Sequence, residues 1–268
     1  MAKKERLDVL LVNRGLIDTR EKAKRAIMAG LVYSESERLD KPGVKVNDDI
    51  VLYVKGDTLR YVGRGGLKLE KAIETFGLEL ENKVILDIGS STGGFTDCAL
   101  QNGASTVYAL DVGYNQLAWK LRVDDRVIVM ERTNFRYCTK DDFKNGLPDL
   151  ATIDVSFISL KIILPVLKSI FETSGEVIAL VKPQFEAGRD DVGKKGIVRD
   201  KKVHQRVLDN MIEFATEIGY QVKGLSFSPI TGGEGNIEFL LHLGWQQVQE
   251  GEETISVLEV VDQAHSQL

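Results

Sequence analysis

Cysteine is scarce in this sequence, and long apolar runs are missing from it. The two cysteines, Cys98 and Cys138, are too few and too far apart for a disulfide scaffold or a zinc site. We therefore expect two small buried thiols, no metal and a reducing, cytoplasmic location. The most apolar window, residues 157–171, is interrupted by two lysines and a proline, whereas a membrane span needs about 20 apolar residues. Because the first residues are charged, we also expect no signal peptide, no membrane partner and a soluble chain.

The charges are divided unevenly along the chain. Of its 268 residues, 35 are basic and 40 are acidic, which gives a net charge of −5. The first 60 residues hold 13 basic and 10 acidic side chains, and the remainder holds 22 and 30. A positive N-terminal part on an acidic body indicates a region that faces a polyanion. The length and the 43% hydrophobic content predict one ordinary domain and a smaller one.

The first 60 residues have the pattern of a small α+β unit. Apolar residues in the window 7–11 predict a short helix, into which the charged N-terminus runs and which Gly15 ends. Asp18 with Glu21 forms a capping box for a second, basic helix over residues 19–29. Short strands of a small sheet are expected at 31–33, 44–46 and 50–54. The basic helix face fits either a polyanion surface or an ordinary solvated one.

Residues 84–97 combine a buried strand that ends in a carboxylate, a glycine turn and the start of a helix. Gly89, Gly93 and Gly94 can adopt positive φ and allow the backbone to approach a ligand. The spacing differs from the dinucleotide G-x-G-x-x-G pattern, and no Gly-Lys-Ser/Thr follows as in a phosphate-binding P-loop. By itself the pattern fits either a ligand loop or an ordinary strand-to-helix turn.

Beyond residue 60 the sequence alternates between strand and helix patterns. Further strands are expected at 105–111, 127–130, 150–154, 175–181, 220–225 and 237–243. The connection between the last two is too short for a helix, so they should form an antiparallel hairpin. The pattern predicts an α/β, Rossmann-like fold of the methyltransferase type, with a mostly parallel seven-stranded sheet and a C-terminal hairpin.

Polar side chains follow several of these strands where the strands end. Asp111 ends the second strand, Asn134 follows the third, and Asp154 ends the fourth. Ligands of open α/β sheets bind at this edge. The number of residues from Asp87 to Asp111 is near the sequence separation at which a carboxylate binds the ribose hydroxyls of a nucleotide. We therefore predict a pocket for S-adenosylmethionine. The predicted cofactor residues are Asp87, Gly89, Ser90, Ser91, Gly93, Gly94, Phe95, Asp111, Asn134 and Asp154.

Five segments make the chain resemble a known family. They are Arg64–Lys68, Leu86–Asp97, Asp154–Leu160, Val181–Glu186 and Gly235–Phe239. Together they are similar to the TlyA family, proteins labelled hemolysins that resemble FtsJ-type ribose 2′-O-methyltransferases of ribosomal RNA. The similarity spans about residues 4–243. It implies an S4-like RNA-binding domain at 1–60 and a methyltransferase domain at 61–245, and it leaves residues 246–268 as an unassigned tail.

The resemblance also implies catalytic residues. The family's Lys-Asp-Lys-Glu tetrad corresponds here to Lys68, Asp154, Lys182 and Glu238. Lys182 would act as the base or the oxyanion stabiliser at a ribose 2′-oxygen, because methyl transfer requires alignment and the management of one proton. Asp154 and Glu238 would orient it. Lys68 would tune the charge or contact the target phosphate.

Basic residues outside the tetrad are candidates for contacts with ribosomal RNA or ribosomal subunits. By resemblance to the S4-type module, the phosphate contacts would come from Arg6, Arg14, Arg20, Lys24 and Arg25. We add Arg64, and also Arg189, Lys194 and Lys195 from residues 184–199, which form either a mobile lid or a plain exposed loop. Phe185 and Phe227 either stack on a base or belong to the core.

Three functions remain open at this point. The first is a ribose 2′-O-methyltransferase of ribosomal RNA, with cytidine as the target that the family suggests. The second is a membrane-active hemolysin, as the family label indicates. The third is a non-catalytic RNA-binding protein on the same fold. The sequence gives no indication of the oligomeric state.

Overall fold

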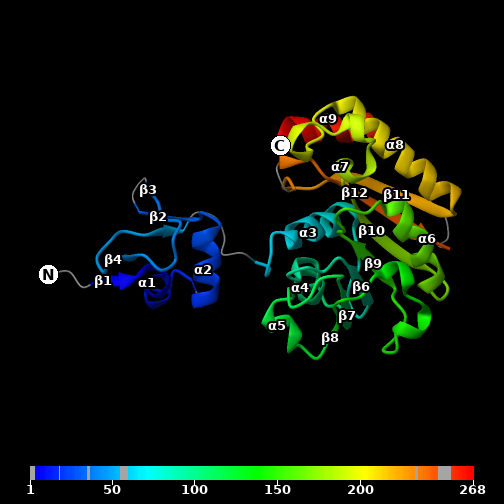
Figure 1. Ribbon diagram of the computed structural model, residues 1–268. Helices are drawn as coiled ribbons and strands as arrows, with labels where there is room; N and C mark the ends of the chain where they lie inside the picture. Colours follow the sequence, from blue (N-terminus) through cyan, green and yellow to red (C-terminus); the bar gives the residue numbers. More distant parts are fainter. Residues whose placement is uncertain (1–3, 18, 35–36, 55–59, 233–234, 247–254) are drawn as a thin grey trace. The chain divides into compact units, whose positions relative to one another are not determined.

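The computed structural model describes residues 4–17, 19–34, 37–54, 60–232, 235–246 and 255–268. The chain divides into two compact units, Met1–Arg60 and Tyr61–Leu268 (Figure 1). Each unit has its own hydrophobic core. Within the described residues, no helix is both long and apolar enough to cross a lipid bilayer.

The first unit packs two helices against two small antiparallel sheets. One sheet pairs β1 with β4, and the other has the order β3-β2-β5. The elements are β1 (Lys4–Arg6), α1 (Leu7–Asn13), α2 (Arg20–Met28), β2 (Val32–Ser34), β3 (Glu37–Arg38), β4 (Lys45–Asn47) and β5 (Tyr53–Val54). Leu7, Leu10 and Leu11 of α1 are buried in its core, together with Ala23, Ala26 and Ile27 of α2. The apolar stripe of residues 7–11 thus fixes the side of α1 that faces inward.

Two details of the first unit differ from the sequence-based expectation. The charged residues before α1 do not run into the helix but form strand β1, which pairs with β4 through Glu5 and Val46. Local sequence could not predict this strand because its partner lies about 40 positions away. The helix α2 is capped by Thr19, whose hydroxyl accepts a hydrogen bond from the Lys22 amide at 3.3 Å. The predicted cap, Asp18, lies outside the described residues.

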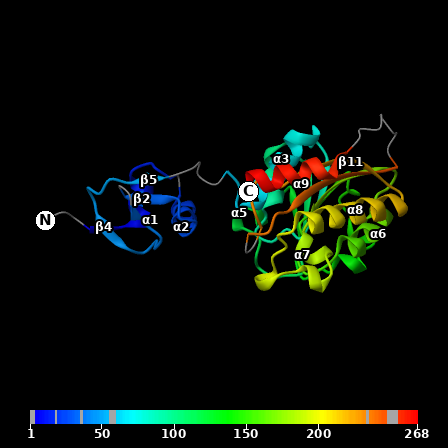
Figure 2. The same ribbon diagram turned by 90° about the horizontal axis from the view of Figure 1, so that it is seen from above.

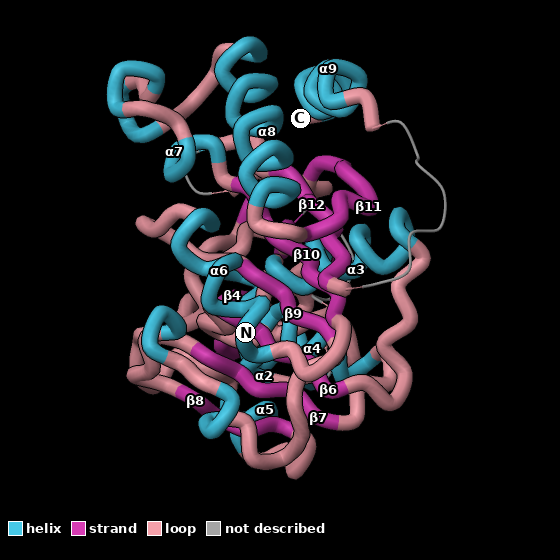
Figure 3. The backbone as a smooth tube through the Cα atoms, turned by 90° about the vertical axis from the view of Figure 1, so that its right-hand side faces the viewer, coloured by secondary structure: helices cyan, strands magenta, loops and turns pink. Residues whose placement is uncertain are grey.

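A seven-stranded sheet with the order β11-β12-β10-β9-β6-β7-β8 forms the centre of the second unit (Figure 3). Strands β6 to β10 are parallel, and β12 runs antiparallel to both β10 and β11. The strands are β6 (Val84–Ile88), β7 (Thr106–Leu110), β8 (Val127–Met130), β9 (Leu150–Ile153), β10 (Gly175–Val181), β11 (Tyr220–Phe227) and β12 (Phe239–Trp245). The predicted fold class, including the C-terminal hairpin, is confirmed.

Helices cover both faces of this sheet. Alternate residues of β6 point to opposite faces, so that Ile85 packs in one core cluster and Leu86 in the other. One face carries α3 (Gly65–Phe76), α4 (Gly94–Gln101) and α5 (Trp119–Arg122), and the other carries α6 (Leu160–Ile170) and α8 (Lys201–Glu217). Short 3₁₀ turns follow β8 at Phe135–Tyr137 and Lys140–Asp142. Cys98 and Cys138 are both buried, as their spacing suggested.

The C-terminal residues that had no assignment contain helix α9 (Val257–Gln267), which packs on α8 and β11 of the second unit (Figure 2). Val261 and Ala264 of α9 are fully buried in the larger core cluster. The ring nitrogens of His204 in α8 and His265 in α9 lie 2.9 Å apart. This segment of the chain is therefore part of the second unit's core.

The insert after β10 contains more regular secondary structure than its polar composition suggested. It consists of α7 (Pro183–Glu186) and 3₁₀ turns at Arg189–Asp191 and Lys194–Gly196. Ile197 and Val198 are buried, and the Val198 amide donates to Asn236 Oδ1 at 3.1 Å. The carboxylate of Glu186 accepts hydrogen bonds from Ser159 Oγ and the Leu160 amide. Both ends of the insert are thus anchored, while its basic residues remain exposed.

Candidate active site

A cavity of about 310 Å³ opens at the carboxyl edge of the parallel strands. Its volume lies at the lower end of the range typical of small-molecule sites. The walls come from α3, the β6–α4 loop, the ends of β9 and β10, and the segment before β12. The lining residues are Arg64, Gly65, Lys68, Gly89, Ser90, Ser91, Thr92, Gly94, Phe95, Asp154, Ser156, Lys182, Ile230, Thr231, Gly232 and Glu238.

The four tetrad residues meet in this cavity as a chain of ion pairs. Lys68 Nζ lies 2.7 Å from Glu238 Oε2 and 3.3 Å from Asp154 Oδ2. Asp154 Oδ1 lies 2.5 Å from Lys182 Nζ, so that this carboxylate joins both lysines. Lys68 and Glu238, which are 170 positions apart in the chain, are thereby in direct contact. Glu238 thus pairs with Lys68 rather than with Lys182, the residue that it was expected to orient.

Burial and opposite charges act against each other within the tetrad. The side chains of Lys68, Lys182 and Glu238 are 9%, 10% and 3% exposed. Burial alone lowers the pKa of Lys68, but the charges of Asp154 and Glu238 and their hydrogen bonds outweigh it and raise this pKa. Burial alone raises the pKa of Asp154, but the two lysines outweigh it and lower this pKa. Lys68 is therefore held as a cation and Asp154 as an anion.

The loop between β6 and α4 requires glycine at two cavity positions. Gly89 has a φ of +89°, and a Cβ built there would lie 2.4 Å from the carbonyl oxygen of Asp154. A Cβ on Gly94 would lie 2.8 Å from the Gly66 amide nitrogen. The loop therefore packs directly against the end of β9 and the start of α3, the elements that carry Asp154 and Lys68.

Four of the predicted cofactor residues are not brought to the cavity wall. Asp87 is buried, and its carboxylate accepts hydrogen bonds from the Thr96 amide and from the hydroxyls of Thr96 and Thr152. Burial raises the pKa of Asp87 to about 7, against the opposing effect of these bonds. Gly93 instead faces Leu117 and Leu121. Asp87 and Gly93 therefore support the glycine loop without lining the cavity.

Asp111 and Asn134, the other two, accept hydrogen bonds from backbone amides of the nearby loops. Asp111 Oδ2 accepts from the Ser91 amide at 2.8 Å, and Oδ1 accepts from the Gly113 amide at 2.7 Å. Asn134 Oδ1 accepts from the Arg136 amide and caps the 3₁₀ turn. Asp111 thus lies directly beside the glycine loop, and its contact with a cofactor ribose stays a prediction.

Glu131, which follows β8 and fixes the loop after β7, was not among the predicted site residues. Its carboxylate accepts hydrogen bonds from the backbone amides of Asn115, Gln116 and Leu117 and pairs with Arg122. These contacts lower the pKa of Glu131, although burial alone raises it. No sequence pattern distinguishes such a loop-binding acid from an exposed one.

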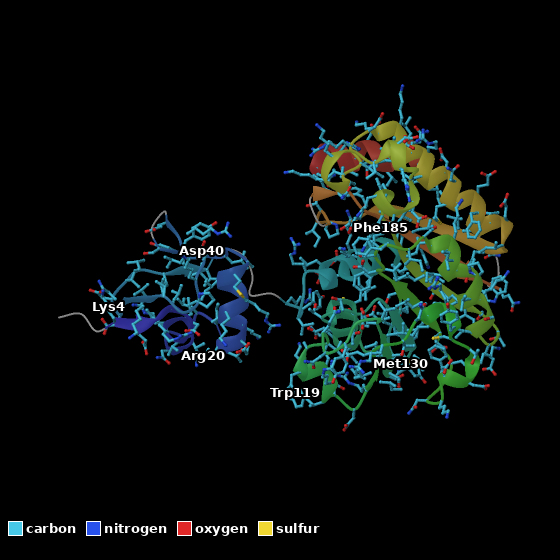
Figure 4. All side chains as sticks on the ribbon, viewed as in Figure 1. Lys4, Arg20, Asp40, Trp119, Met130 and Phe185 are labelled. Atoms are coloured by element: carbon cyan, nitrogen blue, oxygen red, sulfur yellow. The ribbon has the colours of Figure 1, made fainter. Side chains whose placement is uncertain are left out.

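A hydroxyl group and an aromatic ring lie close to Lys182, those of Ser156 and Phe185. Ser156 Oγ lies 3.2 Å from Lys182 Nζ. The next residue, Phe157, is 91% exposed and has a φ of +65°. Its ring centroid lies 5.1 Å from that of Phe185, which Figure 4 labels. Phe227, by contrast, is buried in the core beneath the Lys71 ammonium.

Other cavity residues also escaped the sequence analysis. Gly65 and Thr92 lie within or beside recognised motifs, so their nearness in the sequence was an available signal. Ile230, Thr231 and Gly232 follow β11, and nothing in their sequence marks them as part of a site. A Cβ on Gly232 would lie 2.1 Å from Glu238 Oε1. This glycine therefore leaves the space that the Glu238 carboxylate occupies.

The basic residues predicted to bind RNA differ in their surroundings within the first unit. Asp8 is buried and pairs with both Arg6 and Arg20 at 2.9 Å, leaving these arginines about half exposed. The hydrogen bond from Arg6, together with Arg20 and against the effect of burial, lowers the pKa of Asp8 to about 2. Arg14 donates to the carbonyls of Asp48 and Ile50. Asp8 thus fixes the direction of two of the predicted phosphate contacts.

The remaining residues predicted to bind RNA are ion-paired, half-buried or exposed. Lys24 pairs with Glu21 at 2.8 Å, and Arg25 is half-buried on α2. Arg64 is exposed and lines the cavity. Arg189, Lys194 and Lys195 are exposed on the insert. Their contacts with RNA stay predictions.

Known proteins resemble this chain over nearly its whole length. The family described as FtsJ-like methyltransferase matches residues 61–245, and the S4 domain matches residues 5–49. The Bacillus subtilis protein named "Putative rRNA methyltransferase YqxC" is 66% identical over 100% of this chain and 96% of its own length. The Mycobacterium tuberculosis protein named "16S/23S rRNA (cytidine-2'-O)-methyltransferase TlyA" is 42% identical over 92% of each chain.

A solved structure supports the same assignment. The one described as a "Putative hemolysin from Streptococcus thermophilus" is 56% identical, with a TM-score of 0.79, and covers 100% of this chain and 98% of its own. The FtsJ-like match includes the complete sheet and all four tetrad residues, and members of this family use S-adenosylmethionine. The expected family and enzyme class are therefore confirmed. The chain belongs to the FtsJ-like methyltransferase family and, with its N-terminal S4 domain, to the TlyA group within it.

Proposed function

We propose that this enzyme transfers a methyl group from S-adenosylmethionine to a ribose 2′-hydroxyl of ribosomal RNA, with cytidine as the modified nucleotide. The observation that carries the proposal is the ion-pair chain Lys68–Asp154–Lys182, closed by Glu238, in one cavity with the glycine loop. The names of the relatives, which specify ribosomal RNA and cytidine 2′-O-methylation, support the choice of substrate.

The residues of the cavity fit the cofactor. Gly89 and Gly94 leave the backbone free of side chains there, and Ser90, Ser91 and Phe95 complete this wall. The two lysines and two carboxylates of the tetrad balance in formal charge, so a positively charged sulfur can approach without a net repulsion. When bound, S-adenosylmethionine supplies a methyl group on a good leaving group.

The two lysines are suited to different tasks. Lys68 contacts two carboxylates and is therefore held as a structural cation. Among the described residues, Lys182 contacts one carboxylate, Asp154, together with the Ser156 hydroxyl. A lysine ammonium can donate three hydrogen bonds, so Lys182 has one donor left for the ribose oxygen. In its charged form Lys182 would stabilise the developing oxyanion, whereas in its neutral form it would accept the 2′-hydroxyl proton, and Asp154 would orient it in either case.

RNA would be held by surfaces on both units. Arg6 and Arg20, oriented by Asp8, would contact phosphates without reading sequence. Near the cavity, Phe185 and its neighbour Phe157 offer ring faces to the base of the target nucleotide. The basic insert would add phosphate contacts through Arg189, Lys194 and Lys195.

Methyl transfer to ribosomal subunits from radiolabelled S-adenosylmethionine tests the proposal. We expect label in RNA that resists alkaline cleavage at one position, since a 2′-O-methyl group blocks the attack of the ribose oxygen. Label on a base, or an unlabelled product at saturating enzyme, would overturn the proposal. Dye leakage from liposomes would favour the membrane-active alternative. A chain that binds RNA but shows no heat of cofactor binding would favour the non-catalytic one.

A further inference from the structure

The exposed aromatic side chains of the second unit are gathered at one edge of its sheet. Among the described residues of this unit, Tyr114, Trp119, Tyr137 and Phe157 are 64%, 75%, 76% and 91% exposed, and no other aromatic side chain is classed as exposed. All four lie in the segments that follow β7, β8 and β9, at the carboxyl edge where the cavity opens. Trp119 is labelled in Figure 4. Scattered exposed aromatics would need no explanation, but a set confined to the edge of the active site indicates a binding role.

Two arginines accompany these rings. The Arg132 guanidinium lies 4.0 Å from the ring centroid of Tyr114, and that of Arg136 lies 5.5 Å from that of Tyr137. The Arg132 amide also donates to the Gly113 carbonyl at 2.9 Å, which holds the loops after β7 and β8 side by side. Both arginines are exposed. The surface therefore combines flat apolar faces with positive charge, which is the combination that unpaired nucleic acid requires.

Two acidic groups beside these loops are already engaged. Glu131 accepts three backbone hydrogen bonds and pairs with Arg122. Asp111 accepts hydrogen bonds from two backbone amides. Their negative charges are thus partly compensated by the loops themselves. Within the part of the chain that the structure describes, no carboxylate pairs with Arg132 or Arg136; both guanidinium groups lie by tyrosine rings, and that of Arg136 also donates to Asn134 Oδ1 at 3.3 Å.

We infer that Tyr114, Trp119 and Tyr137, with Arg132 and Arg136, form a docking surface for an unpaired stretch of RNA next to the active site. Its bases stack on the rings and its phosphates contact the arginines. Duplex RNA hides its base faces and would leave the three rings without partners. The inference rests on the proposed function, and it specifies the substrate class further, as a loop or a single strand.

Fluorescence anisotropy with a labelled oligouridine of about 12 nucleotides and the full chain tests this surface. Replacing Tyr114, Trp119 or Tyr137 by leucine should weaken binding about tenfold each, with an unchanged salt dependence, because stacking carries no charge. The double change Arg132→Gln and Arg136→Gln should instead reduce the slope of log affinity against log salt by about 1.4, which is about 0.7 for each lost phosphate contact on a single strand. Leu258→Ala, which changes an exposed apolar residue on α9, is the matched control and should leave affinity unchanged.

Three results would overturn the inference. They are unchanged affinity in the triple leucine variant, equal affinity for a duplex of the same length, and a dimer in light scattering that the triple variant abolishes. The last result would assign the surface to a second copy of the chain. The binding assay needs no methyl transfer, so the two failures can be told apart: an inactive wild-type enzyme would refute the proposed function, whereas unchanged binding by the triple variant would refute the docking surface. Calorimetry with S-adenosylmethionine checks that each variant keeps its cofactor site.

Discussion

The acidic side chains at the carboxyl edge of the sheet have different partners in its two parts. Directly after β9 and directly before the antiparallel β12, Asp154 and Glu238 pair with buried lysines and face the cavity. At the ends of β7 and β8, Asp111 and Glu131 accept hydrogen bonds from backbone amides and hold loops in place. An acid after a parallel strand therefore marks the ligand edge of the fold, but only its partners reveal whether it faces the ligand or the loop.

The largest effect should come from Lys182→Ala, which removes the amine at the end of β10. We expect kcat for methyl transfer to fall about 10²- to 10⁴-fold, the usual contribution of a group that handles a proton. Affinity for the cofactor, measured by calorimetry, should change little. Lys161→Ala, an exposed lysine on α6, is the control. A kcat within tenfold of the wild-type value would show that Lys182 does not handle the proton.

The second-largest effect should come from Gly89→Ala, which changes the glycine loop at the cavity. The added Cβ would lie 2.4 Å from the Asp154 carbonyl oxygen, in a backbone conformation with positive φ. We expect a loss of stability of about 1–3 kcal/mol and weaker cofactor binding by at least about tenfold. Gly77→Ala separates the two causes, because Gly77 has a φ of +63° but no atom near its Cβ position. It should lower stability alone, and equal cofactor loss in both variants would contradict the close-approach argument.

Glu131→Gln tests the loop-holding end of the comparison. The amide keeps one acceptor oxygen but loses the charge that pairs with Arg122, so the loop 115–117 should loosen. Because Leu117 packs against Gly93 of the glycine loop, we expect cofactor affinity to fall about tenfold, from the loss of a charged hydrogen bond, with kcat at saturation nearly unchanged. Calorimetry and saturation kinetics measure the two quantities. A fall in kcat alone would place Glu131 with the reacting residues instead.

The smallest effect concerns the opposite edge of the sheet, where Glu176 meets His242 and Lys83 at 3.3 and 2.8 Å. The hydrogen bond from His242 lowers the pKa of Glu176 to about 2, burial opposes this, and Lys83 adds to it. Its contribution is therefore complete above pH ~4.5 and is lost as the pH falls toward 2. After solvent screening we expect about 1 kcal/mol. Urea unfolding of wild type and Glu176→Gln should converge at low pH, and a constant gap would contradict this.

The sequence predicted the sheet because its strands are short, apolar and separated by helical patterns. The antiparallel hairpin could be predicted because the few residues between β11 and β12 leave no room for a helix. Strand β1 was missed because Lys4–Arg6 carry no apolar pattern and pair with a distant segment. The helix α9 was missed because nothing in the chain before it indicates where its apolar side, Val261 and Ala264, would find a partner.

The site was predictable only in part. Asp154 and Lys182 end adjacent strands, so their contact follows from topology. Lys68 reaches them from a helix, and only the family resemblance pointed to it. Asp87 ends a strand in the same way as Asp154 but turns toward Thr96 and Thr152. The sequence does not encode that choice locally, because it depends on which hydroxyls the neighbouring elements supply.

The carboxylate that Lys68 and Lys182 share makes substitutions in this corner of the enzyme strongly non-additive. Without Asp154, the two largely buried ammonium groups would repel each other with no carboxylate between them. Removing one of the lysines as well should then relieve the damage. We expect Asp154→Asn to unfold at a lower urea concentration than wild type, and the added change Lys68→Met to recover part of the difference. Such a suppressor would identify Asp154 as the residue that keeps two like charges together.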